Sequence, residues 1–171
     1  VTIAGQETAV TPSEAVTLST KNSSSSTLDI TNGISGAIGD YITTSEGSHS
    51  LLSNLSNAFA KDTDVTLAVT GTLTDSTDVS KVNVLLAASN HGTVSGAFSG
   101  TSTNAKNLSS TTNGLTLTIS DAVNFADADT IRGKTSGTVT YSSEIVDSFD
   151  NFFLNNGNIQ TNSNAIVDKD A

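Results

Sequence analysis

Short stretches of the chain alternate apolar and polar residues with a period of two. The alternation is clearest at residues 66–70 (TLAVT) and 116–120 (TLTIS), and residues 27–31 (TLDIT) repeat it. This period, together with β-branched residues, is typical of a strand that buries one face. We therefore predict half-buried β-strands in these stretches, and again at residues 93–98 and 136–141.

Helical spacing follows the strand at residues 66–70. Apolar residues between 79 and 86 (VSKVNVLL) stand at i, i+3, i+6 and i+7, which suits one face of an α-helix. Asp75 or Ser76 is placed to cap the N-terminus of this helix. Weaker patterns of the same kind predict short helices around residues 50–59 and 127–132.

A unit of strand, short helix and strand recurs along the chain. The copies begin at Thr27, Thr66 and Thr116, and a last helix is predicted from Ser143 onward. Such a unit cannot bury its own apolar face, so it must pack against the next copy. We predict a mainly β fold, either an antiparallel β-sandwich or stacked β-repeat units, with two to four short helices. The alternative is that Thr-rich strands look alike without being repeats.

A serine run sets the N-terminal residues apart from this repeat. Residues 21–26 (KNSSSS) predict a surface loop. They separate residues 1–20, an expected N-terminal β arm of two strands on either side of Pro12, from residues 27–171, an expected β-rich repeat body. The chain begins with Val, from which we expect that a leader or the preceding part of a longer chain has been removed.

The arm offers a means of self-assembly. An extended segment can add as a strand to the exposed sheet edge of a neighbouring molecule, and its alternate side chains then fill pockets on the acceptor. Val1, Ile3 and Val10 are the candidate residues for this role. The alternative, left open by the sequence, is that the arm pairs within its own chain.

The segment from Thr116 to Phe152 (TLTISDAVNFADADTIRGKTSGTVTYSSEIVDSFDNF) resembles the repeats of very large secreted bacterial surface proteins, notably those of cyanobacteria and marine bacteria. A weaker likeness runs from Thr66 to Phe98. The resemblance implies structural or adhesive work outside the cell and implies nothing about catalysis. The glycine- and aspartate-rich nonapeptides of calcium-binding modules do not occur in this sequence.

Composition narrows the possible partners. The 171 residues include 26 Ser, 27 Thr and 16 Asn, and only 14% are charged, with a net charge of −10. No run of Lys or Arg could neutralise successive phosphates, and no apolar run approaches the roughly 20 residues that span a bilayer. We therefore expect no nucleic-acid partner and no membrane insertion. The absence of Cys, Met and Trp fits an extracellular protein, because thiols and thioethers oxidise there.

Calcium is the one cofactor that the sequence raises. It prefers six to eight oxygen ligands, and alternate residues of a loop can direct two carboxylates at one ion. Asp62 and Asp64 form one such Asp-x-Asp pair, and Asp127 and Asp129 form another. The alternative is that Asp127 and Asp129 lie in the first turn of a helix, favourably placed with respect to its dipole, while Asp62 and Asp64 lie in a solvated loop.

Catalytic motifs are missing from the sequence. The chain has two His residues, His49 and His91, and neither a zinc-protease motif nor a G-x-S-x-G motif occurs. We predict a non-enzymatic extracellular structural protein, a subunit or repeat of a bacterial surface fibre, coat or adhesin, whose partner is itself or a neighbouring repeat. The alternative is a carbohydrate- or ice-binding module, with or without calcium, for which the Thr-x-Thr pairs would supply hydroxyl groups.

Overall fold

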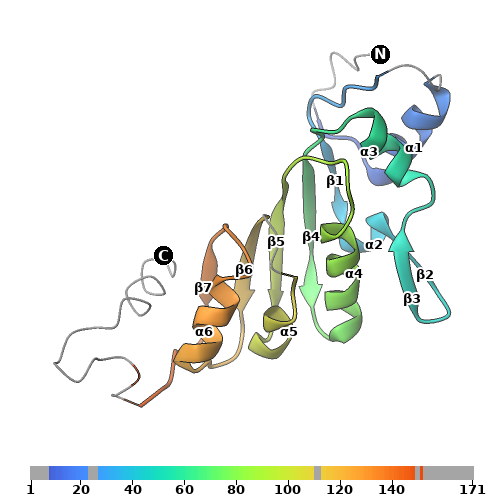
Figure 1. Ribbon diagram of the computed structural model, residues 1–171. Helices are drawn as coiled ribbons and strands as arrows, with labels where there is room; N and C mark the ends of the chain where they lie inside the picture. The colour runs from blue at the N-terminus through green and yellow to red at the C-terminus, as the bar shows by residue number, and fades with distance from the viewer. Residues whose placement is uncertain (1–7, 23–26, 110–112, 149–150, 152–171) are drawn as a thin grey trace. The chain divides into compact units, whose positions relative to one another are not determined.

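The computed structural model of the chain describes residues 8–22, 27–109, 113–148 and 151. Five of its strands form a parallel sheet in the order β1-β4-β5-β6-β7, and β2 and β3 form a separate antiparallel hairpin (Figure 1). In chain order, the elements are α1 (Pro12–Lys21), β1 (Ile34–Ala37), α2 (Ile38–Tyr41), β2 (Ile42–Ser45), β3 (Ser48–Leu51), α3 (Leu55–Lys61), β4 (Leu67–Leu73), α4 (Ser76–Leu86), β5 (Val94–Gly100), α5 (Ser102–Lys106), β6 (Gly114–Ile119), α6 (Phe125–Arg132) and β7 (Val139–Tyr141).

The prediction of a mainly β fold, as an antiparallel sandwich or as stacked β-repeat units, is wrong. The protein has an α/β fold, because helices connect successive parallel strands. The physical reason for the error lies in the strands. Parallel sheets usually have both faces covered, and the sequences of their strands are continuous apolar runs. Alternation of apolar and polar residues is typical of antiparallel sheets with one solvated face. Here the parallel strands alternate, as in β4, where Leu67, Val69 and Leu73 are buried and Thr70 is exposed.

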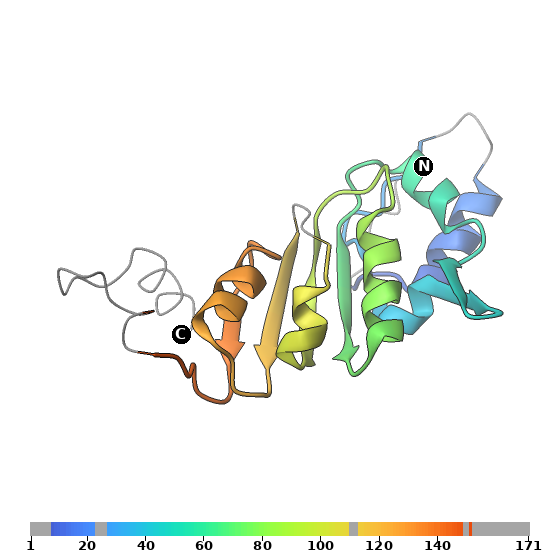
Figure 2. The same ribbon diagram turned by 60° about the horizontal axis from the view of Figure 1, so that its bottom comes forward.

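The chain forms two compact units, and each is described by itself. The first comprises residues 1–71 and 80–96, and the second comprises residues 72–79 and 97–171. In the first unit β1 pairs in parallel with β4, with Ile34 opposite Leu67. Helices α1 and α3 of this unit lie side by side (Figure 2).

The N-terminal arm differs from the expectation of two strands. Among the described residues 8–21, only Val10 pairs as a strand residue, in a parallel bridge with Ile34, and the expected second strand is helix α1. This helix begins with a capping box, in which the Thr11 hydroxyl accepts the Glu14 N–H and the Glu14 carboxylate accepts the Thr11 N–H at 2.8 Å. Pro12 fits the first helical turn, where an N–H has no partner to lose.

Parts of the expected arm and loop cannot be compared with the structure. Val1 and Ile3 lie outside the described residues, as do residues 23–26 of the expected serine-rich loop. The loop prediction also included Lys21, which is instead the last residue of α1.

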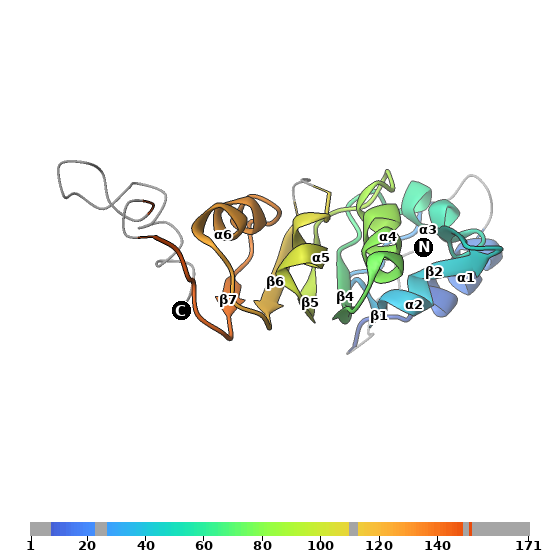
Figure 3. The same cartoon turned by 90° about the horizontal axis from the view of Figure 1, so that it is seen from below.

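In the second unit, β6 pairs in parallel with β7, and helices α5 and α6 lie on the same side of these strands (Figure 3). Leu115, Leu117 and Ile119 of β6 are buried, while the intervening threonines are half-exposed. Tyr141 of β7 donates a hydrogen bond from its hydroxyl to the carbonyl of Ala128 in α6 at 2.9 Å. One face of the strands is therefore covered by helices, and the other presents hydroxyl groups.

Two glycines allow a close backbone approach just before strands β5 and β7. Gly92 precedes β5 and Gly137 precedes β7, in the shared sequence Gly-Thr-Val. A Cβ atom on Gly92 would lie 2.4 Å from the carbonyl oxygen of Asp64, and one on Gly137 would lie 2.3 Å from that of Leu115. Each glycine thus permits the backbone to approach the neighbouring chain segment closely, because any side chain would collide with it.

The predicted helices vary in accuracy. The helix at residues 79–86 is confirmed as part of α4, where the Asp75 carboxylate accepts the N–H groups of residues 77 and 78. The helix at 127–132 is confirmed as part of α6. Residues 48–51 are a strand rather than the start of a helix. Ser143 begins no helix within the described residues, since Ile145 forms a parallel bridge with Val123 instead.

Candidate functional site

The first Asp-x-Asp pair lies in a turn between α3 and β4, which we call the Asp62–Asp64 turn (residues 62–64). Helix α3 ends because Asp62 leaves helical geometry, with φ −140° and ψ 85°. The Asp62 N–H still donates to the carbonyls of Ala58 and Phe59. The Asp62 carboxylate accepts the buried N–H of Ile30 at 2.6 Å, so it connects this turn to a segment 32 residues earlier in the sequence.

Asp62 is a charged side chain in an unfavourable place. The residue is only 6% exposed, and burial raises the pKa of its carboxyl group above the usual 3.8. The Ile30 N–H opposes this shift, while the negative charges of Asp64 and Asp29 add to it. Within the described residues, no Lys, Arg or His forms an ion pair with Asp62 or Asp64. The turn therefore favours a proton, or a cation, between its carboxylates.

The carboxylates of the turn face a small hollow of about 240 Å³, whose walls include Asp29, Asp62, Asp64 and Thr66. Calcium would find carboxylate oxygens there, as the sequence predicted for Asp62 and Asp64. However, no group of three or more His, Cys, Asp or Glu side chains in the described part of the chain is arranged to hold a metal ion. Two carboxylates supply only part of the six to eight oxygens that calcium prefers, so calcium binding at this turn stays a prediction.

The second Asp-x-Asp pair has a different setting. Asp127 and Asp129 lie in helix α6, where the Asn124 side chain caps the N-terminus by accepting the Asp127 N–H at 2.8 Å. Asp127 forms an ion pair with Lys106 of α5, and Asp129 forms one with Arg132, each at 2.8 Å. Each carboxylate thus has its own basic partner, and the structure does not bring the two together around one ion.

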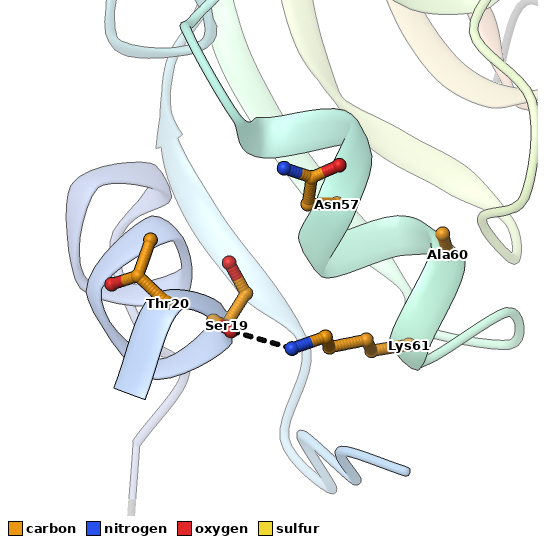
Figure 4. A pocket seen from close by; sticks show the side chains of 5 residues that line it. All are labelled: Ser19, Thr20, Asn57, Ala60 and Lys61. Carbon is orange, nitrogen blue, oxygen red and sulfur yellow. Dashed lines mark hydrogen bonds between the residues drawn. The ribbon is translucent and has the colours of Figure 1, made fainter. Parts of the chain in front are cut away.

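A larger hollow, of about 410 Å³, lies between α1 and α3 and includes Ser19, Thr20, Asn57 and Lys61 in its lining (Figure 4). The Lys61 ammonium donates to the carbonyl oxygen of Ser19 at 2.7 Å and to that of Asn22 at 2.9 Å. A cation at the C-terminal end of a helix satisfies carbonyl groups that have no helical partner. Lys61 therefore links the C-terminal end of α1 to α3 through hydrogen bonds, which is a structural role.

Each histidine makes a hydrogen bond through Nδ1, while the buried Nε2 of His91 has no hydrogen-bond partner among the described residues. His49 Nδ1 lies 3.0 Å from the Thr44 hydroxyl across the β2–β3 hairpin. His91 Nδ1 lies 2.7 Å from the carbonyl oxygen of Gly92, and its ring packs edge-on against Phe59 with the centroids 5.4 Å apart. That the chain is not an enzyme remains a prediction, because these contacts do not test catalysis.

The sequence analysis missed two carboxylates that the structure makes prominent. The alternation at residues 27–31 predicts a strand that includes Asp29, yet Asp29 lines the hollow at the Asp62–Asp64 turn. Asp121 follows β6 and accepts both the N–H and the hydroxyl of Ser102 at 2.7 Å. Asp121 stands directly after an alternating strand, a position where a capping side chain could have been expected, whereas nothing local in the sequence marks the contact of Asp29.

Comparisons with known proteins complete this picture. A scan against protein-family models, a search of the curated proteins and a search of the solved structures each found no match to this chain. Among the described helices, none is long and apolar enough to cross a membrane. The class that the fold defines is an α/β protein with a parallel sheet and a small antiparallel hairpin.

Proposed function

We propose that this chain is a non-enzymatic extracellular structural protein, a subunit or repeat of a bacterial surface fibre, coat or adhesin, that assembles with copies of itself or with neighbouring repeats. The observation that carries this proposal is the order of the strands in the sheet. Apart from the hairpin, the strands are neighbours in the same order in which they occur in the chain. Such an arrangement grows by adding one strand and one helix at a time, as repeat proteins do.

The surface chemistry supports the same role. The chain is rich in uncharged Ser, Thr and Asn, and its net charge is −10. Exposed strand residues such as Thr70 and Ser99 are small and hydroxylated. The likeness of residues 116–152 to bacterial surface repeats also supports a location outside the cell, as does the absence of Cys, Met and Trp.

Electron microscopy of the purified full chain tests this proposal, in parallel with size-exclusion chromatography. We expect filaments or sheets by negative stain, and elution well ahead of a 17.4 kDa monomer. Both measurements should be repeated with a calcium chelator, since loss of assembly on chelation would assign a role to the Asp62–Asp64 turn. A clean monomer under both conditions would contradict self-assembly.

One observation favours a second candidate function, binding of a carbohydrate or of ice. Thr118 of β6 lies directly opposite Thr140 of β7 in the parallel register, and both side chains are half-exposed on the face that the helices leave uncovered. Neighbouring strands are about 4.8 Å apart, so these two threonines form one adjacent pair on that face. Binding of a glycan array or thermal hysteresis by a monomer, with loss in Thr118→Val, would favour this alternative.

A further inference from the structure

We propose that the hollow between α1 and α3 binds one unit of a neutral sugar. Its volume of about 410 Å³ lies in the range of roughly 300–1,000 Å³ that is typical of small-molecule sites. Both helices belong to the first compact unit, so the site lies within that unit alone. The inference goes beyond the proposed structural role, and it does not depend on whether copies of the chain assemble.

Polar side chains line the hollow from both helices (Figure 4). Ser19 and Thr20 come from the last turn of α1, and Asn57 and Lys61 come from α3. Ala60 adds an apolar methyl group to this lining. A few polar groups that converge on a partly apolar hollow are typical of a ligand site, and groups on helices are positioned more precisely than groups on loops.

Most polar atoms of the lining are hydrogen-bond acceptors. The hydroxyls of Ser19 and Thr20 each donate their one proton to a carbonyl oxygen of α1, at 2.9 Å and 2.8 Å. Both hydroxyl oxygens keep lone pairs that can accept. The Asn57 amide nitrogen donates to the side-chain oxygen of Asn54 at 3.3 Å, and the Asn57 amide oxygen is a further acceptor. A ligand that fits this lining must therefore bring hydrogen-bond donors.

Lys61 supplies a donor to the same hollow. An ammonium group has three protons, and Lys61 directs two of them to the carbonyl oxygens of Ser19 and Asn22, at 2.7 Å and 2.9 Å. The third can therefore meet an oxygen of the ligand. Within the described residues, no Asp or Glu forms an ion pair with Lys61.

This combination of groups selects the chemical class of the ligand. A sugar hydroxyl both donates and accepts, so it suits the lone pairs of Thr20 and Asn57 as well as the proton of Lys61. A metal cation would be repelled by the ammonium group. Phosphate or sulfate would meet Lys61 but would direct its own lone pairs at the other acceptors, and the net charge of −10 opposes its approach. A neutral sugar is the class that remains.

Saturation-transfer NMR tests the inference, because it detects weak ligands on monomers and on large assemblies alike. The sample is the full chain, and the probes are D-glucose, D-galactose and D-mannose. We expect a saturable signal from at least one of these sugars. The dissociation constant should be on the order of 1–10 mM, since a single sugar ring has few atoms with which to make contacts.

Variants locate the bound sugar. Ala60→Leu adds bulk to the lining with a residue that favours helix, and we expect it to abolish the signal. Asn57→Ala and Thr20→Val each remove one acceptor and should weaken binding roughly 2- to 10-fold. Thr103→Val is the matched control, because it makes the same change at an exposed threonine of α5, and it should bind as wild type does. Lys61 is left unchanged, since its replacement would also break the link between α1 and α3.

Three results would overturn the inference. The first is the absence of a saturable signal from all three sugars up to about 100 mM, roughly ten times the weakest expected dissociation constant. The second is a signal that is lost in Thr118→Val and retained in Ala60→Leu, which would place the sugar on the exposed face of β6. The third is displacement of the sugar by an equal concentration of sodium phosphate, which would assign the hollow to an anion.

The outcomes are distinguishable from those that test the proposed function. Filaments that bind none of the sugars would overturn the inference alone. A monomer that binds a sugar, with loss in Ala60→Leu, would support the inference and contradict self-assembly.

Discussion

Two Asp-x-Asp pairs with the same spacing, one in each compact unit, have opposite environments. Asp62 and Asp64 lie in a turn, where Asp62 is buried and has no basic partner within the described residues. Asp127 and Asp129 lie on a helix, where each forms an ion pair at 2.8 Å. On a helix, residues two apart point to different sides, so the pair separates. The element that carries the two residues, rather than their spacing, decides whether their charges meet.

The two Asp pairs also differ in their effect on the stability of the fold. The turn holds carboxylates close to one another and raises the pKa of Asp62, mainly because the group is buried. The helix distributes its carboxylates to Lys106 and Arg132, where they contribute modestly to stability. Substitutions in the turn should therefore have larger effects than the corresponding substitutions in the helix, and the predictions below test this order.

The largest expected effect follows from replacing Asp62. Asp62→Ala leaves the buried Ile30 N–H without its acceptor at 2.6 Å, which costs about 1–3 kcal/mol. Asp62→Asn retains an acceptor for Ile30, removes the buried charge and places an amide donor near Asp64. We therefore expect Asp62→Asn to be at least as stable as wild type near pH 7, and Asp62→Ala to be clearly less stable, as measured by urea unfolding.

Asp129→Ala is the matched control for that measurement. Its ion pair with Arg132 is partly exposed and spans one turn of the helix, so its loss should cost only about 0.2–0.5 kcal/mol. Equal losses in Asp62→Ala and Asp129→Ala would contradict the distinction between the turn and the helix.

Calcium should bind and stabilise the Asp62–Asp64 turn and should not bind helix α6. With two carboxylates and no third acidic or His ligand arranged for a metal in the described residues, we expect weak binding, on the order of 10⁻⁴–10⁻³ M as in extracellular modules. At about ten times the dissociation constant, binding adds about 1.4 kcal/mol of stability. Thermal unfolding with added calcium chloride should show this gain in wild type and in Asp127→Asn, and not in Asp64→Asn. No gain in wild type would rule calcium out.

The strands and the longest helix were predictable from the sequence, and the direction of the strands was not. Alternation at residues 66–70 and 116–120 marks one buried face whichever way the neighbouring strand runs. The connecting helix at residues 79–86 was the better guide, because strands joined by helices form parallel sheets. The helix between the strands, rather than their alternation, therefore indicates the α/β fold.

Local signals in the N-terminal arm were present and were outweighed. Thr11, Pro12 and Glu14 form a capping box with Pro at the first helical position, which marks a helix start. The apolar residues after it alternate weakly, which favours a strand if the capping box is disregarded. For the candidate site, the pair Asp62 and Asp64 could be identified by spacing, but the approach of Asp29 depends on tertiary structure that no local pattern encodes.

The pH dependence of stability should differ in sign between Asp62 and Asp121. A raised pKa means that the folded state binds the proton more tightly than the unfolded state, so Asp62 contributes more stability below its raised pKa and loses it as pH rises. Burial also acts to raise the pKa of Asp121, but hydrogen bonds from Ser102 outweigh it and the pKa is lowered. Asp121 therefore contributes stability above its ordinary pKa and loses it as pH falls.

Unfolding of wild type and Asp62→Asn between about pH 7 and pH 4, and of wild type and Asp121→Asn down to about pH 2, measures these signs. The stability of wild type relative to Asp62→Asn should rise as the pH is lowered, and its stability relative to Asp121→Asn should fall. Curves that shift in the same direction for both variants would contradict the assignment.

A similarly small effect is expected for the ion pair between Lys106 of α5 and Asp127 of α6. Lys106 and Asp127 are about one-third and one-quarter exposed, at 31% and 27%, and exposed pairs contribute about 0.2–1 kcal/mol. Lys106→Ala should therefore lower the free energy of unfolding by an amount in this range at low ionic strength. Added salt screens exposed charges, so the difference from wild type should shrink toward zero at about 1 M sodium chloride. The Asp62→Ala deficit should persist there, because it comes from an unpaired buried N–H rather than from a screened charge. A salt-independent loss in Lys106→Ala would mean that Lys106 acts through packing of α5 against α6, and the contrast between the two pairs would then rest on the turn alone.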